Sequence, residues 1–185
     1  MMKEGFHIAV VRSGGQTGAD RGALDAARGA GVPIRGWCPL GGWAEDMPAP
    51  PGLLATYPEL AEAPSREPIV RTEWNVRDSD ATLIVCAEPI DRRSGTAATI
   101  EFARRLGKPH FISNGSDCAH VVAWLSALAP ERDEGLDLNV AGPRESGSPG
   151  TYELARRLIA QLIAQDKTGD SPPSYRPPSY PGTNE

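Results

Sequence analysis

The sequence predicts an α/β protein with a Rossmann-like, doubly wound and mostly parallel sheet of about five strands. Short apolar runs alternate with amphipathic stretches along the chain, as they do in strand–helix–strand units. The run over residues 81–86 is apolar enough to be buried on both faces, like a central strand of a parallel sheet. Three glycine-rich segments each stand between a predicted strand and a predicted helix, where this architecture has its βα turns.

The first part of the chain begins with a predicted strand over residues 6–13 and a helix over 19–30 that ends at a pair of glycines. A short strand is expected over 32–37. Residues 38–64 are rich in proline and glycine and are too long for an ordinary connection. We therefore expect a functional loop there, either a lid or an oligomer arm.

Serines mark the starts of several later helices, because a serine at the N-cap accepts a hydrogen bond from the first turn. Ser65, Ser116 and Ser148 stand at such positions, and a proline follows Ser148 at the first helical position. The predicted elements are, in order, a helix over 65–78, a strand over 81–86, a helix over 97–106, a strand over 110–113, a helix over 116–128, a strand over 136–141 and a helix from 148 to about 165.

A length of 185 residues predicts a single domain, which we place at residues 1–165. Residues 166–185 form a polar, proline-rich tail that cannot bury a core, so we expect disorder there. The tail contains Pro-Pro-Ser-Tyr twice, at 172–175 and 177–180. This pattern fits a WW-domain ligand or a low-complexity tail, and we favour the second because so short a pattern arises easily.

Charge and cysteine content limit the class of protein. The net charge of −5 and the pI near 5.3 argue against a nucleic-acid or membrane surface, which would need a basic face. The three cysteines show no C-x-x-C pair and no zinc spacing, so a reducing cytoplasm is expected. Cys38 is expected near a surface or cleft. No apolar stretch reaches 18 residues, and the first residues do not resemble a signal peptide.

The segment from Ser13 to Gly18 carries the most specific functional signal. It joins an apolar run to a predicted helix, so several backbone N–H groups gather at the positive end of a helix dipole. Such a turn binds anions, above all phosphate. The spacing S-x-G-x-x-G is close to the dinucleotide fingerprint, and no Gly-Lys-Ser/Thr follows, so the segment is not a P-loop.

Two further glycine-rich segments follow predicted strands and precede helices. Loops at the carboxyl ends of parallel strands share one edge of the sheet, so we expect a single anion-binding site there. The alternative is that all three are ordinary βα turns. The candidate binding residues are Ser13, Gly14, Gly15, Gln16, Thr17, Gly18 and Arg21 from the first segment, Ser94, Gly95 and Thr96 from the second, and Gly142, Arg144, Glu145 and Ser146 from the third. We expect Gly15→Val to abolish anion binding and to leave the fold intact.

No catalytic or metal-binding set is evident. The three histidines are scattered, and none is paired with a nucleophile at a recognisable spacing. Asp20 falls in a first helical turn, where the dipole alone favours a carboxylate. We therefore predict neither catalytic residues nor metal ligands.

Several motifs, in the same order, resemble the molybdenum carrier family, the molybdenum cofactor carrier proteins. The resemblance extends over residues 6 to about 163. Its motifs are Ser-Gly-Gly-Gln-Thr-Gly-Ala-Asp-Arg-Gly (13–22), Gly-Trp-Cys-Pro (36–39), Ala-Glu-Asp (44–46), Arg-Thr-Glu-Trp-Asn-Val-Arg-Asp-Ser-Asp (71–80), Ser-Gly-Thr (94–96) and Leu-Asn-Val-Ala-Gly-Pro-Arg-Glu-Ser (138–146). It implies a Rossmann-like carrier that binds and protects molybdenum cofactor without chemistry of its own, as a homo-oligomer (a dimer or tetramer).

The chemistry of this cargo is compatible with the three loops. Molybdenum cofactor is a pterin with a terminal phosphate, and its metal is held by its own dithiolene sulfurs. The phosphate suits a glycine turn at a helix start, and molybdate or phosphate alone would suit it too. The pterin edge would need a carboxylate, for which Glu45, Asp46 and Glu145 are candidates. Trp37 or Trp43 would stack on the ring, or belong to the core.

The broader superfamily includes the LOG phosphoribohydrolases, which supply an alternative function. These enzymes carry Gly-Gly-x-Gly-Thr-x-x-Glu, whose glutamate serves cleavage of a nucleoside monophosphate. Aligned on Gly95-Thr96, this chain has Thr99 at the glutamate position, and Glu101 is rotated by roughly 200° around the helix. The sequence thus argues against hydrolysis, while a nucleotide- or ADP-ribose-sensing domain stays open as a third function.

Overall fold

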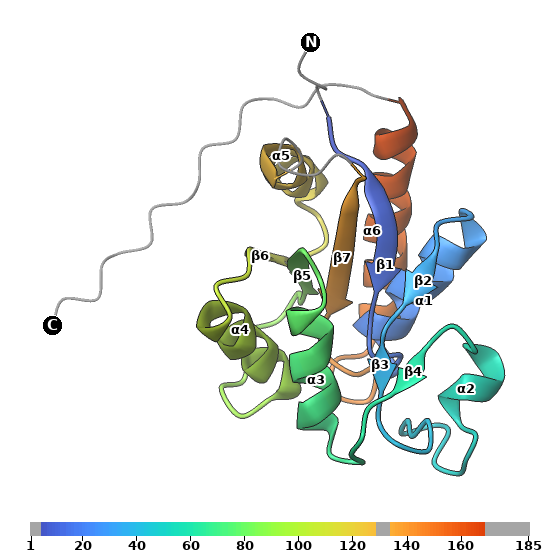
Figure 1. Ribbon diagram of the computed structural model, residues 1–185. Coiled ribbons are helices and arrows are strands. Elements are labelled where there is room, and N and C mark those ends of the chain that lie inside the picture. Colours follow the sequence, from blue (N-terminus) through green and yellow to red (C-terminus); the bar gives the residue numbers. More distant parts are fainter. Residues whose placement is uncertain (1–4, 129–133, 169–185) are drawn as a thin grey trace, which may run out of the picture.

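The computed structural model describes residues 5–128 and 134–168. A five-stranded, wholly parallel sheet forms its centre, in the order β2-β1-β7-β5-β6 (Figure 1). The elements are β1 (Ile8–Arg12), α1 (Ala19–Gly29), β2 (Ile34–Arg35), β3 (Trp37–Cys38), α2 (Leu53–Thr56), β4 (Ala61–Glu62), α3 (Pro68–Arg77), β5 (Ala81–Val85), α4 (Gly95–Arg105), β6 (His110–Ser113), α5 (Cys118–Leu128), β7 (Leu136–Ala141) and α6 (Thr151–Thr168). The predicted Rossmann-like α/β class is confirmed.

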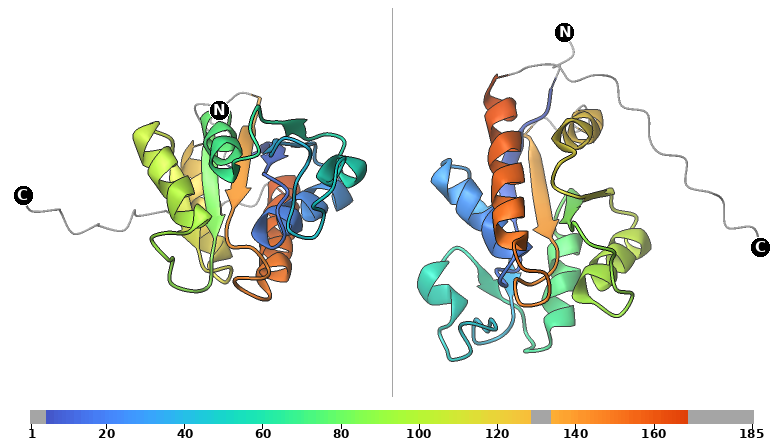
Figure 2. Two further views of the ribbon diagram at one scale, coloured as in Figure 1. Left: turned by 90° about the horizontal axis from the view of Figure 1, so that it is seen from below. Right: turned by 180° about the vertical axis from the view of Figure 1, so that it is seen from behind.

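Helices cover both faces of the sheet. The two views of Figure 2 show α1, α5 and α6 behind the strands and α3 and α4 in front of them. The central strands are apolar because both of their faces are covered: every residue of β5 is buried, and Leu136, Leu138 and Val140 of β7 are at most 1% exposed. The main core lies between the sheet and the pair α1 and α6.

The strand predicted over 32–37 is divided in two at Gly36. A side chain at Gly36 would overlap the carbonyl oxygen of Ser13, so only glycine lets the chain pass this close to β1. On one side of Gly36, β2 joins the main sheet. On the other side, β3 pairs with β4 in a separate two-stranded parallel sheet.

The proline-rich segment 38–64 packs against the core. Leu53, Tyr57 and Leu60 are at most 5% exposed, and Cys38 is fully buried, so the prediction that Cys38 lies near a surface is wrong. The cause is the small β3–β4 sheet, which folds the segment back onto α1 and β1. This part of the chain is a structured lobe, which the sequence described only as a loop.

Several helix boundaries differ from the predictions, and α4 begins at Gly95 where a start at residue 97 was expected. α3 begins at Pro68 with Glu67 as its N-cap, while Ser65 accepts a hydrogen bond from the Glu67 N–H in the preceding turn. α5 begins at Cys118. α6 begins at Thr151, because residues 148–150 form a turn, and it ends at Thr168.

The helix α6 continues three residues beyond residue 165, where we place the end of the domain. Asp166, which we had assigned to the tail, accepts a hydrogen bond from the Ile8 N–H at 3.0 Å and so fixes the helix end to β1. The rest of the tail, residues 169–185 with both Pro-Pro-Ser-Tyr copies, lies outside the described residues. Within the described ranges, no helix has both the length and the apolarity to cross a bilayer.

Candidate functional site

The three predicted loops meet at the carboxyl edge of the sheet. They follow β1, β7 and β5, which are adjacent strands. The first and third loops touch, because the Ala19 N–H donates to the Pro143 carbonyl oxygen at 3.2 Å and a side chain at Gly18 would overlap that carbonyl. Gly142 lies equally close to the Val85 carbonyl at the end of β5. The convergence predicted from the strand pattern is present.

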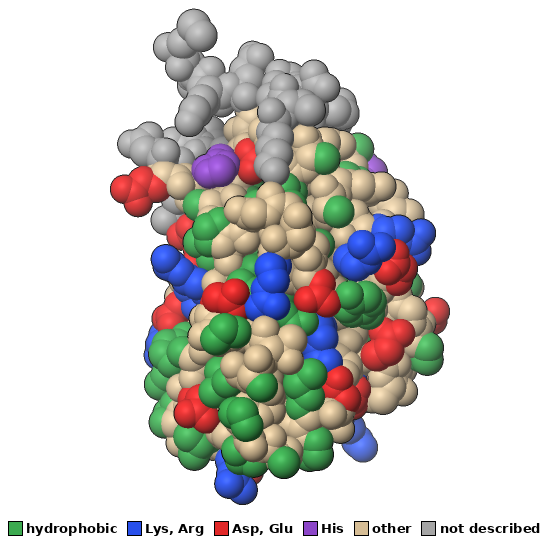
Figure 3. All heavy atoms as spheres, turned by 90° about the vertical axis from the view of Figure 1, so that its right-hand side faces the viewer, with side chains coloured by type: hydrophobic (Ala, Val, Ile, Leu, Met, Phe, Trp, Pro, Cys, Tyr) green, Lys and Arg blue, Asp and Glu red, His purple; other side chains and the backbone are tan. Residues whose placement is uncertain are grey.

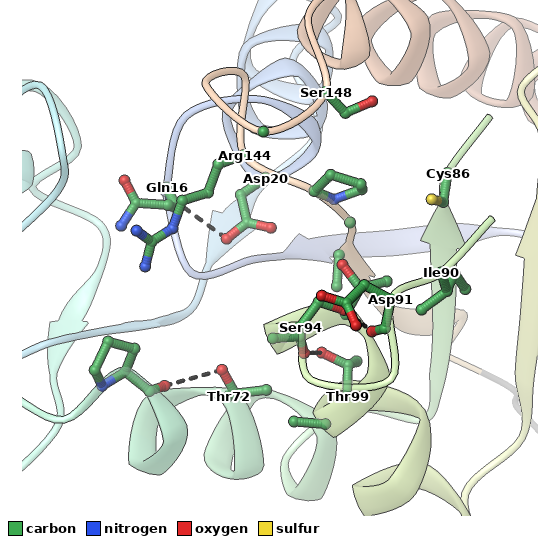
Figure 4. A pocket seen from close by; sticks show the side chains of 18 of the residues that line it. Gln16, Asp20, Thr72, Cys86, Ile90, Asp91, Ser94, Thr99, Arg144 and Ser148 are labelled. Atoms are coloured by element: carbon green, nitrogen blue, oxygen red, sulfur yellow. Dashed lines mark hydrogen bonds between the residues drawn. The ribbon is translucent and has the colours of Figure 1, made fainter. Parts of the chain in front are cut away.

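A pocket of about 570 Å³ opens at this edge, between the second and third loops and the start of α3 (Figure 4). This size is in the usual range for small-molecule sites. Asp20 and Arg144 lie on one side in Figure 4, and Ser94 lies on the other. Seven of the predicted site residues line the pocket: Gln16, Ser94, Gly95, Thr96, Gly142, Arg144 and Ser146.

The start of α4 is the part of the pocket best suited to an anion. Ser94 is the N-cap, and its Oγ accepts a hydrogen bond from the Ala97 N–H at 3.1 Å. Gly95 and Thr96 occupy the first two helical positions, whose N–H groups have no acceptor within the helix. A side chain built on Gly95 would meet no atom within 4 Å. The glycine thus leaves room for a ligand beside two backbone donors.

Asp20 and Arg71 form a buried ion pair beside the pocket. Arg71 Nη1 lies 3.0 Å from Asp20 Oδ2, which also accepts from the Gln16 N–H at 3.3 Å. Asp20 is 4% exposed, and burial raises its pKa although the guanidinium of Arg71 opposes the shift. The Nε of Arg71 is buried and makes no hydrogen bond to the described residues. A polar group of a ligand would meet this pair at the wall of the pocket.

Sequence reasoning missed Arg71 as a site residue. Arg71 comes from α3, which the strand–turn–helix pattern does not connect with the glycine loops. Its guanidinium lies directly over Gly14, where a side chain would overlap it. The sequence signal for Arg71 was the motif over residues 71–80, which the sequence analysis used only to identify the family. Other lining residues outside the predicted set include Asp20, Ile69, Thr72, Cys86, Glu88, Ile90, Asp91, Arg93, Thr99 and Ser148.

Most of the first loop is used for internal contacts and does not line the pocket. The Ser13 hydroxyl donates to the Val140 carbonyl at 2.7 Å, which joins the loop to β7. Gly15 has a φ of 73°, and a side chain there would lie 3.0 Å from Leu60 and 3.1 Å from Leu53. The expectation for Gly15→Val is therefore corrected: its side chain would enter the core under strain.

Two carboxylates considered for the pterin edge fasten the 38–64 lobe to the glycine loops. Glu45 accepts hydrogen bonds from the hydroxyls of Thr17 and Ser146, and these bonds hold its pKa below the ordinary value. Asp46 forms an ion pair with Arg21, which also donates to the Gly15 carbonyl at 3.1 Å. These contacts explain why Thr17 and Arg21 are absent from the pocket wall, while Gly18 packs against the backbone of the third loop.

The start of α6 is occupied by a side chain of the protein. Glu145 accepts hydrogen bonds from the N–H groups of Gly150 and Tyr152, the latter at 2.8 Å. This carboxylate takes the place that we had expected a bound anion to fill. Of the three helix starts at this edge, α4 offers the pocket its first-turn amides, while Glu145 closes that of α6.

The two tryptophans considered for ring stacking differ in their surroundings. Trp37 packs edge-on against Trp74 with ring centroids 4.8 Å apart, and its Nε1–H donates to Asp78 at 2.7 Å, so it is structural. Trp43 is partly exposed, and the Arg144 guanidinium lies 5.4 Å from the centre of its ring. Neither ring lines the pocket, and Trp43 is connected with it through Arg144.

Charge in the pocket is mixed. Arg71, Arg93 and Arg144 stand against Asp20, Asp91 and Glu88, so the wall has no strong excess of either sign. In the described part of the chain, no group of three or more histidine, cysteine, aspartate or glutamate side chains is placed to hold a metal ion. The arrangement suits a ligand with one anionic group and further polar groups.

The LOG-type glutamate has no equivalent at the pocket wall. Thr99 lines the pocket, and its hydroxyl donates to the Gly95 carbonyl at 3.0 Å. Glu101 is exposed on α4 and is not among the lining residues. The side chains of Thr99 and Glu101 point in different directions because two residues correspond to a rotation of roughly 200° around the helix.

The fold and the pocket at the start of α4 define a Rossmann-like protein of the LOG type. A family model described as the circularly permuted YpsA SLOG family matches residues 11–163, and the chain belongs to this family. The chain is similar to a crystal structure described as "Putative molybdenum carrier protein" from Syntrophus aciditrophicus SB, with a TM-score of 0.74 and 34% identity. The match covers 88% of this chain and 99% of the other. No curated protein sequence matches the chain. The suspected family is thus confirmed.

Proposed function

We propose that this protein is a non-catalytic carrier that binds a phosphorylated pterin, the molybdenum cofactor, in the pocket at the start of α4. The open space beside Gly95, next to two unpaired helix-start amides, is the observation that carries the proposal. The phosphate would bind there at the N–H groups of Gly95 and Thr96, because the Ser94 hydroxyl already donates to the Asp91 carbonyl. Arg144 lies across the pocket, where it would contact the same anion.

The residues present fit the chemistry of this cargo. The cofactor brings its metal on its own sulfurs, so the carrier needs hydrogen-bond donors and no metal ligands. The Asp20–Arg71 pair offers a carboxylate and a guanidinium to polar groups of the cargo inside the first pocket. Release of the cargo is also compatible with a pocket that forms no covalent or metal bond. The name of the similar Syntrophus structure supports the proposal.

Binding of a nucleoside monophosphate is the second candidate function. It is favoured by membership of the SLOG family together with the retained Ser94-Gly95-Thr96 turn. Hydrolysis of that nucleotide is disfavoured, because Thr99 replaces the glutamate that LOG-type cleavage uses. The second candidate is therefore a nucleotide-sensing domain that uses the same phosphate site. Location in the cytoplasm and assembly as a homo-oligomer are further parts of the carrier proposal.

Equilibrium dialysis of the full chain tests the proposal. Molybdenum cofactor released from a molybdoenzyme under anaerobic conditions, molybdate and AMP would each be offered separately. We expect saturable binding of one cofactor per chain and weaker binding of AMP. Tight binding of AMP with no affinity for the cofactor or molybdate would replace the carrier by the nucleotide sensor. Release of adenine from AMP would establish a hydrolase.

A further inference from the structure

A second pocket adjoins the first on the far side of Pro68. Its volume is about 370 Å³, and its wall is formed mainly by Leu40, Trp43, Pro48, Pro50 and Arg66. Pro68 lines both pockets. Unlike the first pocket, the second is mostly apolar, with one aromatic ring and one arginine. The two pockets therefore differ in the chemistry that they can bind.

Arg144 connects the two pockets. It lines the first, and its guanidinium lies 5.4 Å from the ring centre of Trp43, which lines the second. Its side chain is 42% exposed, and its ion pair with Glu45 is long, at 4.0 Å. A weakly held arginine at this junction can turn toward an anion in the first pocket or stay over the ring in the second.

The second pocket belongs to surface that the lobe leaves exposed. Leu40 is 42% exposed, and Ile69 beside Pro68 is 47% exposed, both high values for large apolar side chains. Figure 3 shows hydrophobic side chains gathering on the lower part of one face, over the proline-rich lobe. Exposed apolar patches of this kind mark sites for ligands or for other proteins. The wall shared at Pro68 and the contact of Arg144 with Trp43 favour a ligand that reaches both pockets.

We propose that the second pocket binds the planar heteroaromatic ring of a bipartite ligand whose phosphate occupies the first pocket. The ring stacks on Trp43, Arg66 contacts its polar edge, and Arg144 contacts the segment between ring and phosphate. This inference rests on the proposed function and deepens it, because it assigns the pterin to the second pocket, beside the 38–64 lobe. Trp43 is then a binding residue that selects ligands with a ring over simple anions.

Matched variants test the assignment by measuring two affinities separately. The first probe is released molybdenum cofactor, which has both ring and phosphate. The second is inorganic phosphate, which has no ring and is followed through the rise in melting temperature that binding causes. We expect Trp43→Ala to weaken cofactor binding by about five- to a hundredfold, as the loss of one stacked ring does. Its affinity for phosphate should be unchanged.

Two control variants separate stacking from general damage. Trp43→Phe keeps a ring and should restore most of the affinity. Ile112→Ala removes an exposed apolar side chain on β6, outside both pockets, and should change neither affinity. If Trp43→Ala lowers the melting temperature by several degrees, Leu40→Ala serves as a second variant with the same expected loss of cofactor affinity.

The possible failures are distinguishable. If the wild-type protein binds cofactor and the Trp43 and Leu40 variants bind it equally well, the ring site is refuted and the carrier proposal stands. If the wild-type protein binds no cofactor, the proposed function itself fails, and this inference fails with it. If Trp43→Ala converts an oligomer to monomers, as measured by light scattering, and leaves cofactor affinity unchanged, the surface binds a second copy of the chain.

Discussion

Gly95 is the first residue of α4, and a side chain added there would project into the open pocket. A valine at this position would place its methyl groups beside the N–H groups of Gly95 and Thr96, where we propose that the ligand phosphate binds. Gly95→Val should therefore block the anion site without touching another part of the protein. It takes the place of Gly15→Val, for which the sequence suggested the same effect.

The expected magnitudes follow from the surroundings of each glycine. Each hydrogen bond from an N–H group to a charged phosphate contributes roughly 1.5–3 kcal/mol, so losing two weakens binding about a hundredfold or more. Valine in place of glycine at a helix start changes stability by a few tenths of a kcal/mol, so the melting temperature should stay within about 2 °C. Gly15→Val combines left-handed backbone with contacts to Leu53 and Leu60. It should lower the melting temperature by roughly 5–15 °C.

Cofactor and phosphate affinities would be measured for Gly95→Val together with its melting temperature. Gly29→Val is a matched control, because Gly29 also has no neighbour within 4 Å of an added side chain but lies exposed at the end of α1. We expect this control to bind normally. Normal binding by Gly95→Val would refute the phosphate site at α4. A large loss of stability in the same variant would show that the space beside Gly95 is not open.

Three further predictions concern the contacts that fix the loops. Glu145→Gln should lower the melting temperature by about 1–4 °C, because α6 loses the negative charge at its N-terminus; an unchanged value would contradict this capping role. The pKa of Glu45 is held below its ordinary 4.5 by hydrogen bonds from Thr17 and Ser146, so its stabilising effect is present above the unfolded pKa and is lost as the pH falls. The melting temperature of Glu45→Gln should accordingly fall less than that of the wild type between about pH 5 and pH 3, and parallel curves would count against the prediction. Burial raises the pKa of the Cys38 thiol to about 11, so at about pH 8 a thiol reagent should label the partly exposed Cys118 first and Cys38 only after unfolding, as read by mass spectrometry. Early labelling of Cys38 would contradict its burial.

The strand pattern predicted the sheet well because burial on both faces leaves a simple signature. The apolar run over 81–86 and the strand predicted over 136–141 became β5 and β7 with bounds that match closely. The separate sheet of β3 and β4 was not predicted, for the opposite reason. β3 and β4 have two residues each and belong to a small separate sheet. A strand this short has no alternation of apolar and polar residues that could be recognised in the sequence.

The candidate site was predicted in part. Ser94, Gly95 and Thr96 were predicted as a turn that leads into a helix at Ala97, and the structure places Gly95 and Thr96 in the first turn of α4, with Ser94 as its N-cap, at the pocket wall. Too many residues of the first loop were predicted to bind the ligand, since only Gln16 of that set lines the pocket. Its glycines do provide close approach, but the groups that approach them belong to the protein itself: Arg71 over Gly14 and the third loop against Gly18. Sequence spacing cannot tell a ligand from another part of the chain.

The sequence by itself determined the α/β class, the family, and the meeting of three βα loops at one sheet edge, because alternation, glycine turns and motif order are local features. Only the tertiary structure decided which helix start stays open. Glu145 closes α6, Glu45 and Asp46 fasten the lobe to the first loop, and α4 offers its first-turn amides to the pocket. These contacts join residues up to about a hundred positions apart, and such pairings are set by packing in three dimensions, which one sequence does not record.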